Sequence, residues 1–120
     1  MATKGGGLRF EGTYTTDGAG AATVDMVIPA AASKARGVSG GWRVLRAVLG
    51  NSHPTTPLTG GTATLKDNAG AGQTVLTFTQ ATDGTKKELA APVATIVGNL
   101  RITVASGGAS KVGQYLVEVG

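Results

Sequence analysis

The chain has 120 residues, of which 41% are hydrophobic and 15% charged, and its formal net charge is +4. This length gives room for one hydrophobic core, and the composition excludes an intrinsically disordered chain. Because cysteine is absent, a disulfide framework and thiolate metal sites are excluded as well.

The first predicted elements are a glycine-rich arm and two strands. Residues 1–7 have low complexity and end in three glycines, so we expect a flexible N-terminal arm before a single domain spanning 8–120. Strands are predicted over 8–15 and 22–28, paired as a hairpin through a turn in which Gly18 takes a positive φ. In the second strand, Val27 breaks the inside-outside alternation and indicates partial cover on the outer face.

One short helix is expected, over residues 30–36. Pro29 stands before this alanine-rich segment, basic residues occupy its last turn, and Gly37 follows it. Proline at the start and glycine just past the end are typical of helix boundaries.

Residues 42–49 fit two patterns. A strand would place Trp42, Val44 and Val48 on one face, whereas a helix would align Trp42, Leu45 and Leu49. The two valines and the flanking glycines favour the strand.

The second half of the chain continues as short strands separated by glycine turns. A loop is predicted over 51–61, where prolines and glycines cluster. In the clearest strand, Leu100, Ile102 and Val104 alternate with polar residues and should face the core. The strands expected here cover 62–67, 74–79, 92–97, 100–105 and 115–119. About eight short strands with one short helix near 30–36 predict an all-β fold, an antiparallel β-sandwich of jelly-roll-like or immunoglobulin-like type.

Motifs for catalysis are weak. Residues 37–41 match the G-x-S-x-G nucleophile elbow around Ser39, but that motif needs a strand before it, a helix after it and a histidine base. The single histidine, His53, lies in the proline-containing loop and has no second ligand at metal-binding spacing. We therefore expect a protein that is not an enzyme and that uses no cofactor or metal.

The positive charge is concentrated in the middle of the chain. No acidic residue occurs between Asp25 and Asp67, so this interval is either a solvated basic face or a docking surface for an acidic partner. Trp42 is either a core anchor or a contact at a subunit interface. Binding of single-stranded nucleic acid would need several aromatic residues among the basic ones, and no stretch approaches the roughly 18 apolar residues of a membrane span. We expect a soluble, unexported protein without nucleic-acid or membrane partners.

Several segments resemble small β-sandwich virion proteins of tailed bacteriophages, of the capsid decoration or cement type. These are the strand and Lys-Asp turn at 58–67, the segments 98–108 and 113–119, and the opening strand pair around 17–29. The alanine-rich segment 30–37 departs from the pattern.

The resemblance implies a non-enzymatic structural protein that binds the outer surface of the major capsid protein lattice and stabilises it. It would assemble in the host cytoplasm, reside on the outer capsid surface, and self-associate, as a trimer in preference to a dimer. Capsid or subunit contacts are expected from Lys4, Leu8, Lys34, Arg36, Trp42, Arg43, Arg46 and His53.

Two other function classes remain. A tail, baseplate or fibre-associated module would share this fold and composition. A carbohydrate-binding module is a more remote alternative, since such modules present several surface aromatics to sugar rings and aromatic residues make up only 4% of this chain.

Overall fold

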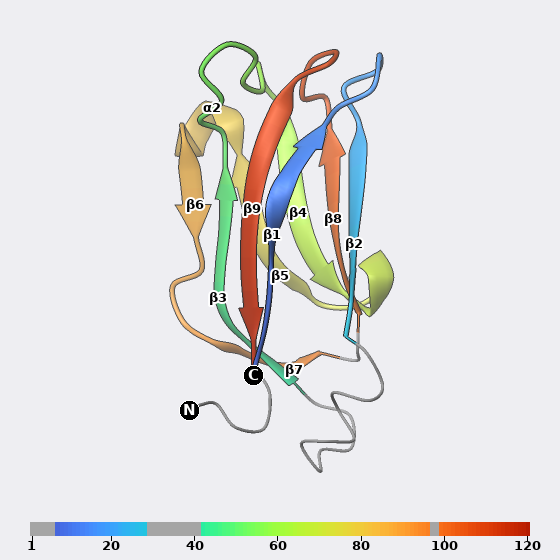
Figure 1. Ribbon diagram of the computed structural model, residues 1–120, viewed down its shortest axis with the longest axis vertical. Coiled ribbons are helices and arrows are strands. Elements are labelled where there is room, and N and C mark those ends of the chain that lie inside the picture. Colours follow the sequence, from blue (N-terminus) through green and yellow to red (C-terminus); the bar gives the residue numbers. More distant parts are fainter. Residues whose placement is uncertain (1–6, 29–41, 97–98) are drawn as a thin grey trace.

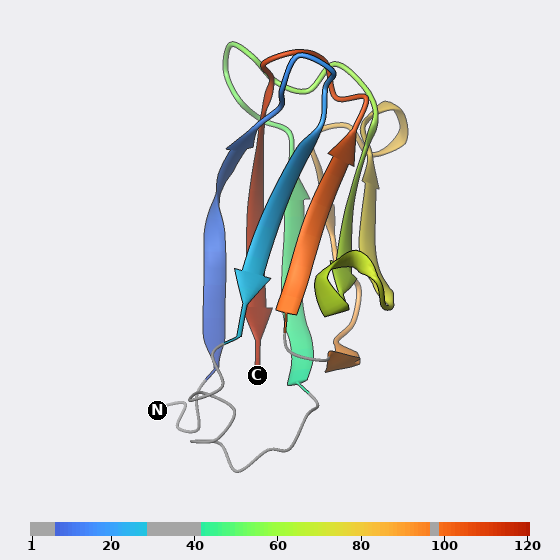
Figure 2. The ribbon, with the colours of Figure 1, turned by 90° about the vertical axis from the view of Figure 1, so that its right-hand side faces the viewer.

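The computed structural model describes residues 7–28, 42–96 and 99–120, and within them the chain forms two antiparallel β-sheets (Figures 1 and 2). Sheet A contains, in spatial order, β1 (Leu8–Thr15), β9 (Val112–Val119), β3 (Trp42–Gly50) and β6 (Lys86–Glu88), with β7 (Val93–Ile96) also paired to β3. Sheet B contains β2 (Ala22–Val27), β8 (Asn99–Ala105), β4 (Thr62–Asp67) and β5 (Thr74–Thr79). A 3₁₀ turn, η1 (Asn68–Gly70), and a single helical turn, α2 (Gln80–Asp83), lie between strands.

The strand pairing is that of a jelly roll. Early strands pair with late ones: β1 with β9, β2 with β8, β3 with β6, and β4 with β5. The chain is thus a long antiparallel ribbon folded over on itself, and the β3–β9 and β4–β8 pairs close it into two sheets. The predicted antiparallel sandwich is confirmed, in its jelly-roll form.

The core lies between the two inner faces and is built from aliphatic residues. The predicted alternation in β8 is confirmed, because Leu100, Ile102 and Val104 are all buried. Val117 and Val119 of β9 are buried in the same way from the opposite sheet. The largest fully buried side chain is Trp42, which is 2% exposed. Of the two roles expected for it, the structure favours the core anchor over the interface contact.

The strand pairing shifts register at three places, in the β3–β7, β3–β9 and β4–β5 pairs. Between its pairs with Val119 and Glu118, β3 holds one extra residue, Leu45, which forms a β-bulge. Leu45 and Arg46 are therefore both exposed, and every later residue of β3 changes face relative to a regular strand. The prediction that Val48 faces the core is wrong for this reason, and Leu49 points inward instead. Val75 is the extra residue of a bulge in β5.

The first two strands form a corner between the sheets and do not pair with each other. β1 belongs to sheet A and β2 to sheet B, so the predicted hairpin is wrong. Asp17 organises the corner, because its Oδ1 accepts hydrogen bonds from the N–H groups of Ala19 and Ala21, at 2.8 and 3.0 Å. These bonds lower the pKa of the Asp17 carboxyl. Gly20, and not Gly18, takes the positive φ, of 82°.

Three loops meet at one end of the sandwich, which we call the loop end: residues 16–21, 51–61 and 106–111 (top of Figure 1). Backbone hydrogen bonds join them, from Gly107 N–H to Gly20 O at 2.9 Å and from Thr59 N–H to Gly107 O at 3.0 Å. Buried Thr16 donates its hydroxyl to Gly108 O and accepts from Lys111 N–H. Polar groups thus hold this end in one arrangement.

The predicted strand positions are confirmed for most of the described chain. The ranges 8–15, 62–67 and 74–79 match β1, β4 and β5. β6 was not expected, and β9 begins at Val112, three residues before the predicted start. The predicted helix at 30–36 and all but the last residue of the predicted arm lie outside the described residues.

Candidate interaction surface

The end opposite the loop end, which we call the terminal end, brings together segments that are far apart in the sequence. Leu8 of β1 pairs with Val119 of β9, and Val119 pairs in turn with Val44 of β3. Arg43 and Gly120 exchange two backbone hydrogen bonds, of 3.0 and 2.9 Å. The start of β1, the start of β3 and the end of the chain therefore lie side by side (Figure 1).

Exposed apolar side chains also occur at the terminal end. Val27, the last residue of β2, is 61% exposed, and Leu45 is 46% exposed. No described residue gives Val27 the partial cover that its sequence position indicated. Leu45 borders a shallow hollow of about 280 Å³. The other residues lining this hollow are Gly7, Leu8, Arg9, Glu118 and Val119.

Glutamates on neighbouring strands lie near two of the arginines of sheet A, Arg9 and Arg46. Arg46 lies opposite Glu118 in the β3–β9 register, and Arg9 Nη1 lies 3.8 Å from Glu118 Oε2. The pKa of Glu88, on β6, is lowered mainly by its hydrogen bond with Lys86 and to a smaller extent by the charge of Arg46. Although the interval between Asp25 and Asp67 contains no acidic residue, the charge of Arg46 is thus partly compensated in space by Glu118 and Glu88.

Arg43 differs from Arg46 in its surroundings. Both side chains are exposed, and neither forms a salt bridge within the described part of the chain. Arg43 exchanges backbone hydrogen bonds with Gly120, whereas Arg46 lies opposite Glu118 in the strand register. Arg43 precedes the bulge, at the rim of the terminal end. The charges of Arg43 and Arg46 are thus both available for pairing with another molecule, and Arg46 lies nearer to carboxylates of its own chain.

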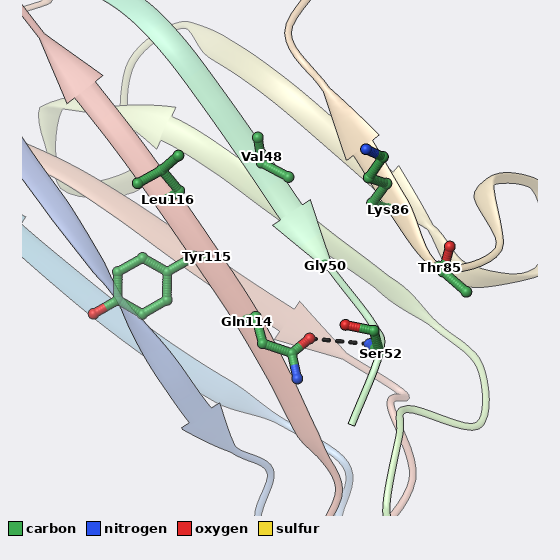
Figure 3. A pocket seen from close by; sticks show the side chains of 8 residues that line it. All are labelled: Val48, Gly50, Ser52, Thr85, Lys86, Gln114, Tyr115 and Leu116. Carbon is green, nitrogen blue, oxygen red and sulfur yellow. Dashed lines mark hydrogen bonds between the residues drawn. The ribbon is translucent and has the colours of Figure 1, made fainter. Parts of the chain in front are cut away.

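A second hollow, of about 250 Å³, lies on the outer face of sheet A (Figure 3). Gly50 has no side chain to fill it, and its apolar wall comes from Val48 and Leu116, which are opposite each other in register. Gln114 forms the polar wall, and its Oε1 accepts a hydrogen bond from Ser52 N–H at 3.0 Å. This hollow could receive a small apolar side chain, and Ser52, Thr85, Lys86 and Tyr115 complete its lining.

His53 lies at the loop end, away from the other expected contact residues. Its Nδ1 accepts hydrogen bonds from the N–H groups of Thr55 and Thr56, at 3.2 and 3.0 Å. The imidazole therefore closes the turn around Pro54.

The described residues contain no group of three or more His, Cys, Asp or Glu side chains that could hold a metal ion. In the same part of the chain, no helix is long and apolar enough to cross a membrane. Ser39, of the G-x-S-x-G match, lies outside the described residues.

The structure therefore brings Leu8, Trp42 and Arg43 together at the terminal end and places Arg46 just beyond the bulge on sheet A. Lys4, Lys34 and Arg36 lie outside the described residues. Lys34 and Arg36 belong to residues 29–41, which we call the basic segment, and the residues on both sides of it, Ile28 and Trp42, belong to the terminal end. The exposure of Leu45 was missed because a bulge depends on the partner strand. The sequence offered only an ambiguous signal, since residues 42–49 fit both a strand and a helix.

No protein-family model matches the chain, and no curated protein matches it in sequence. Among the solved structures that it resembles are two with TM-scores above 0.5. One is from the Bacillus endospore appendages, described as a novel family of disulfide-linked pili, with a TM-score of 0.55, 13% identity and coverage of 99% of this chain and 93% of that one.

The other structure comes from work on the triple jelly roll fold and turret assembly in an archaeal virus, and it matches with a TM-score of 0.54 and 14% identity. Here 95% of this chain matches 28% of the viral one, so the chain spans little more than a quarter of that protein. At these identities the similarity concerns the fold, and it agrees with the jelly-roll topology derived from the strand pairing.

Proposed function

We propose that this chain is a non-enzymatic structural subunit of an assembled particle. Within that class we propose a capsid decoration protein of a tailed-bacteriophage virion, which binds the outer surface of the major capsid protein lattice. The observation that carries this proposal is the gathering of potential contact elements at the terminal end. The last residue of the glycine-rich arm, both boundaries of the basic segment, Arg43 and two exposed apolar side chains all belong to it.

The fold supports a structural role. The two similar structures come from a pilus and from a viral turret, both of which are assemblies of many subunits. This chain has no cysteine, so it cannot form the disulfide links of the pili. Its contacts with neighbours would be non-covalent.

The arrangement of the terminal end suits docking through several weak contacts. Residues 1–7 offer little apolar surface of their own, so their ordering would depend on a partner. Once the body of the protein is docked, an arm attached beside Leu8 acts at high effective concentration. Arg43 would pair with acidic groups on the lattice, and such rim charges act mainly on association rate and salt dependence.

Binding to emptied capsids tests the proposal. Deleting residues 2–7 should weaken capsid binding without lowering the stability of the fold. Arg43→Glu should weaken it in a salt-dependent way, and adding Arg46→Glu should add less, because Arg46 already faces Glu118. Lys111→Glu is the matched control, since it makes the same change of charge at the loop end. Binding of all variants as tightly as the parent, or no binding by the parent, would contradict the proposal.

A filament-forming module, such as a tail or fibre-associated protein, is the second candidate. It is favoured by the match to the pilus structure, which extends over 99% of this chain and 93% of the other. Electron microscopy of the concentrated purified chain distinguishes the two, because a filament-forming module should polymerise without capsids.

A further inference from the structure

The outer edge of β1 is unpaired among the described residues. β1 pairs with β9 on one side only, and in Figure 2 it forms the margin of the molecule. Such an edge presents backbone N–H and C=O groups that can pair with a strand of another chain.

The other edge strands among the described residues are all shorter than β1, which has eight residues. β6 has three residues, two of them lysines, and β5 contains the bulge at Val75. β2 has six residues and lacks proline, lysine and a bulge, and its outward-facing charge, Asp25, is paired with Arg101 of the neighbouring strand at 2.6 Å. β1 is the longest of these edges, and it too has no proline, lysine or bulge. Its protection as an edge strand therefore rests on two charged side chains, Arg9 and Glu11.

The charges on β1 are arranged so that the strand complements itself. Arg9 and Glu11 lie on the outer face on either side of Phe10, and they form an ion pair of 2.7 Å within the strand. In an antiparallel pair of β1 strands with Phe10 opposite Phe10, Arg9 lies opposite Glu11 of the partner subunit, and this happens twice by symmetry. Opposite charges directly across a sheet stabilise the pair, whereas like charges destabilise it.

Other registers lose this match. Centring the two-fold axis on Arg9 or on Glu11 places like charges opposite each other. Centring it on Leu8 or Gly12 places each charge opposite a glycine or a threonine. We propose that two copies of this chain associate through antiparallel β1 strands in the register centred on Phe10, which joins their A sheets into one continuous sheet. This inference does not depend on the proposed capsid function.

Sedimentation velocity of the full chain, without capsids, tests the proposal. A single strand edge buries less than the roughly 1,600 Å² of a standard interface, so we expect a dissociation constant of about 10 µM. Arg9→Glu and Glu11→Arg should each weaken dimerisation at least about tenfold, because each places like charges opposite each other at both symmetric positions.

Two combinations make the test specific. The double variant Arg9→Glu/Glu11→Arg restores opposite charges and should restore the dimer. An equimolar mixture of the two single variants should form a heterodimer, because the two glutamates on β1 of one chain would face the two arginines on β1 of the other. The control Lys86→Glu makes the same change of charge in the similar 2.8 Å pair on β6 and should leave the dimer unchanged.

A parent chain that stays monomeric at about 100 µM would overturn the proposal. So would a dimer that the β1 variants leave intact, or one that Lys86→Glu dissociates. Failure of the mixed single variants to form a heterodimer would refute the register centred on Phe10. Capsid binding takes no part in these measurements, so their outcome is separate from that of the proposed function.

Discussion

Gly113→Ala should destabilise the fold, whereas Gly12→Ala should leave its stability nearly unchanged. These glycines belong to two reciprocal pairs across β1 and β9, in which Tyr14 lies opposite Gly113 and Tyr115 lies opposite Gly12. Neither glycine has a positive φ, so alanine fits both backbones. The outcome therefore depends on the space left by the tyrosine ring.

The space differs between the two pairs. A Cβ at Gly113 would overlap the Oη and Cζ atoms of Tyr14 and would lie 2.8 Å from Cε1. Tyr14 is 7% exposed and packed in the core, so its ring cannot move freely. A Cβ at Gly12 would lie 3.0 Å from Tyr115 Oη and 3.3 Å from Cζ, and the Tyr115 ring, which is only partly buried, can yield by that amount.

The expected magnitude is the difference between two opposing terms. Replacing glycine by alanine within a strand stabilises by about 0.5–1 kcal/mol through backbone entropy. Overpacking a core costs about 1–3 kcal/mol. For Gly113→Ala the overlap outweighs the entropy gain, and we expect a net loss of about 1–2 kcal/mol in the free energy of unfolding. For Gly12→Ala the two terms nearly cancel.

Urea unfolding followed by fluorescence measures both variants. Trp42 is the only tryptophan in the chain and is buried, so its emission reports on the core. Gly113→Ala should also be tested in a Tyr14→Leu background, where the smaller side chain removes the overlap and the cost should disappear. Equal losses for Gly113→Ala and Gly12→Ala, or an unchanged cost in the Tyr14→Leu background, would refute the reasoning.

Two further predictions concern the pH dependence of stability and single-residue deletions in β3. Burial raises the pKa of Tyr14 to about 12, while an unfolded tyrosine titrates near 10, so the free energy of unfolding should fall as pH rises from about 10 to 12, by up to about 2 kcal/mol. Below about pH 10 the Tyr14 hydroxyl contributes no pH dependence. Tyr14→Phe should remove this fall in the free energy of unfolding, and urea unfolding of the parent and the variant at several pH values measures it. Deleting Leu45 should leave the chain folded, because it removes the extra residue of the bulge and restores regular alternation, whereas deleting Val48 should unfold it by turning Leu49 away from the core. Circular dichroism of both deletions checks this, and a folded Val48 deletion beside an unfolded Leu45 deletion would show that the bulge is wrongly placed.

Much of the fold could be predicted from local patterns. The alternation of Leu100, Ile102 and Val104 predicted a strand with one buried face, and the structure buries all three. The predicted ranges of β1, β4 and β5 are confirmed. These predictions are confirmed because the inside-outside alternation of a strand, with a period of two residues, depends only on each residue and its near neighbours.

The candidate site was predicted less completely. The basic interval drew attention to Arg43 and Arg46, but only the pairing of β3 with β9 brings Glu118 opposite Arg46. The exposure of Leu45 likewise arises from a mismatch in length between two strands. Neither feature has a signal within its own segment that identifies the partner.

By itself, then, the sequence determined the class of the fold: short amphipathic strands and glycine turns can bury their apolar faces only in a two-layered β structure. The tertiary structure decided which strands are neighbours, and so which edge is open, which charges are compensated and which loops meet. Those outcomes rest on contacts between residues such as Arg9 and Glu118, which lie at opposite ends of the chain and become neighbours only when the jelly roll closes.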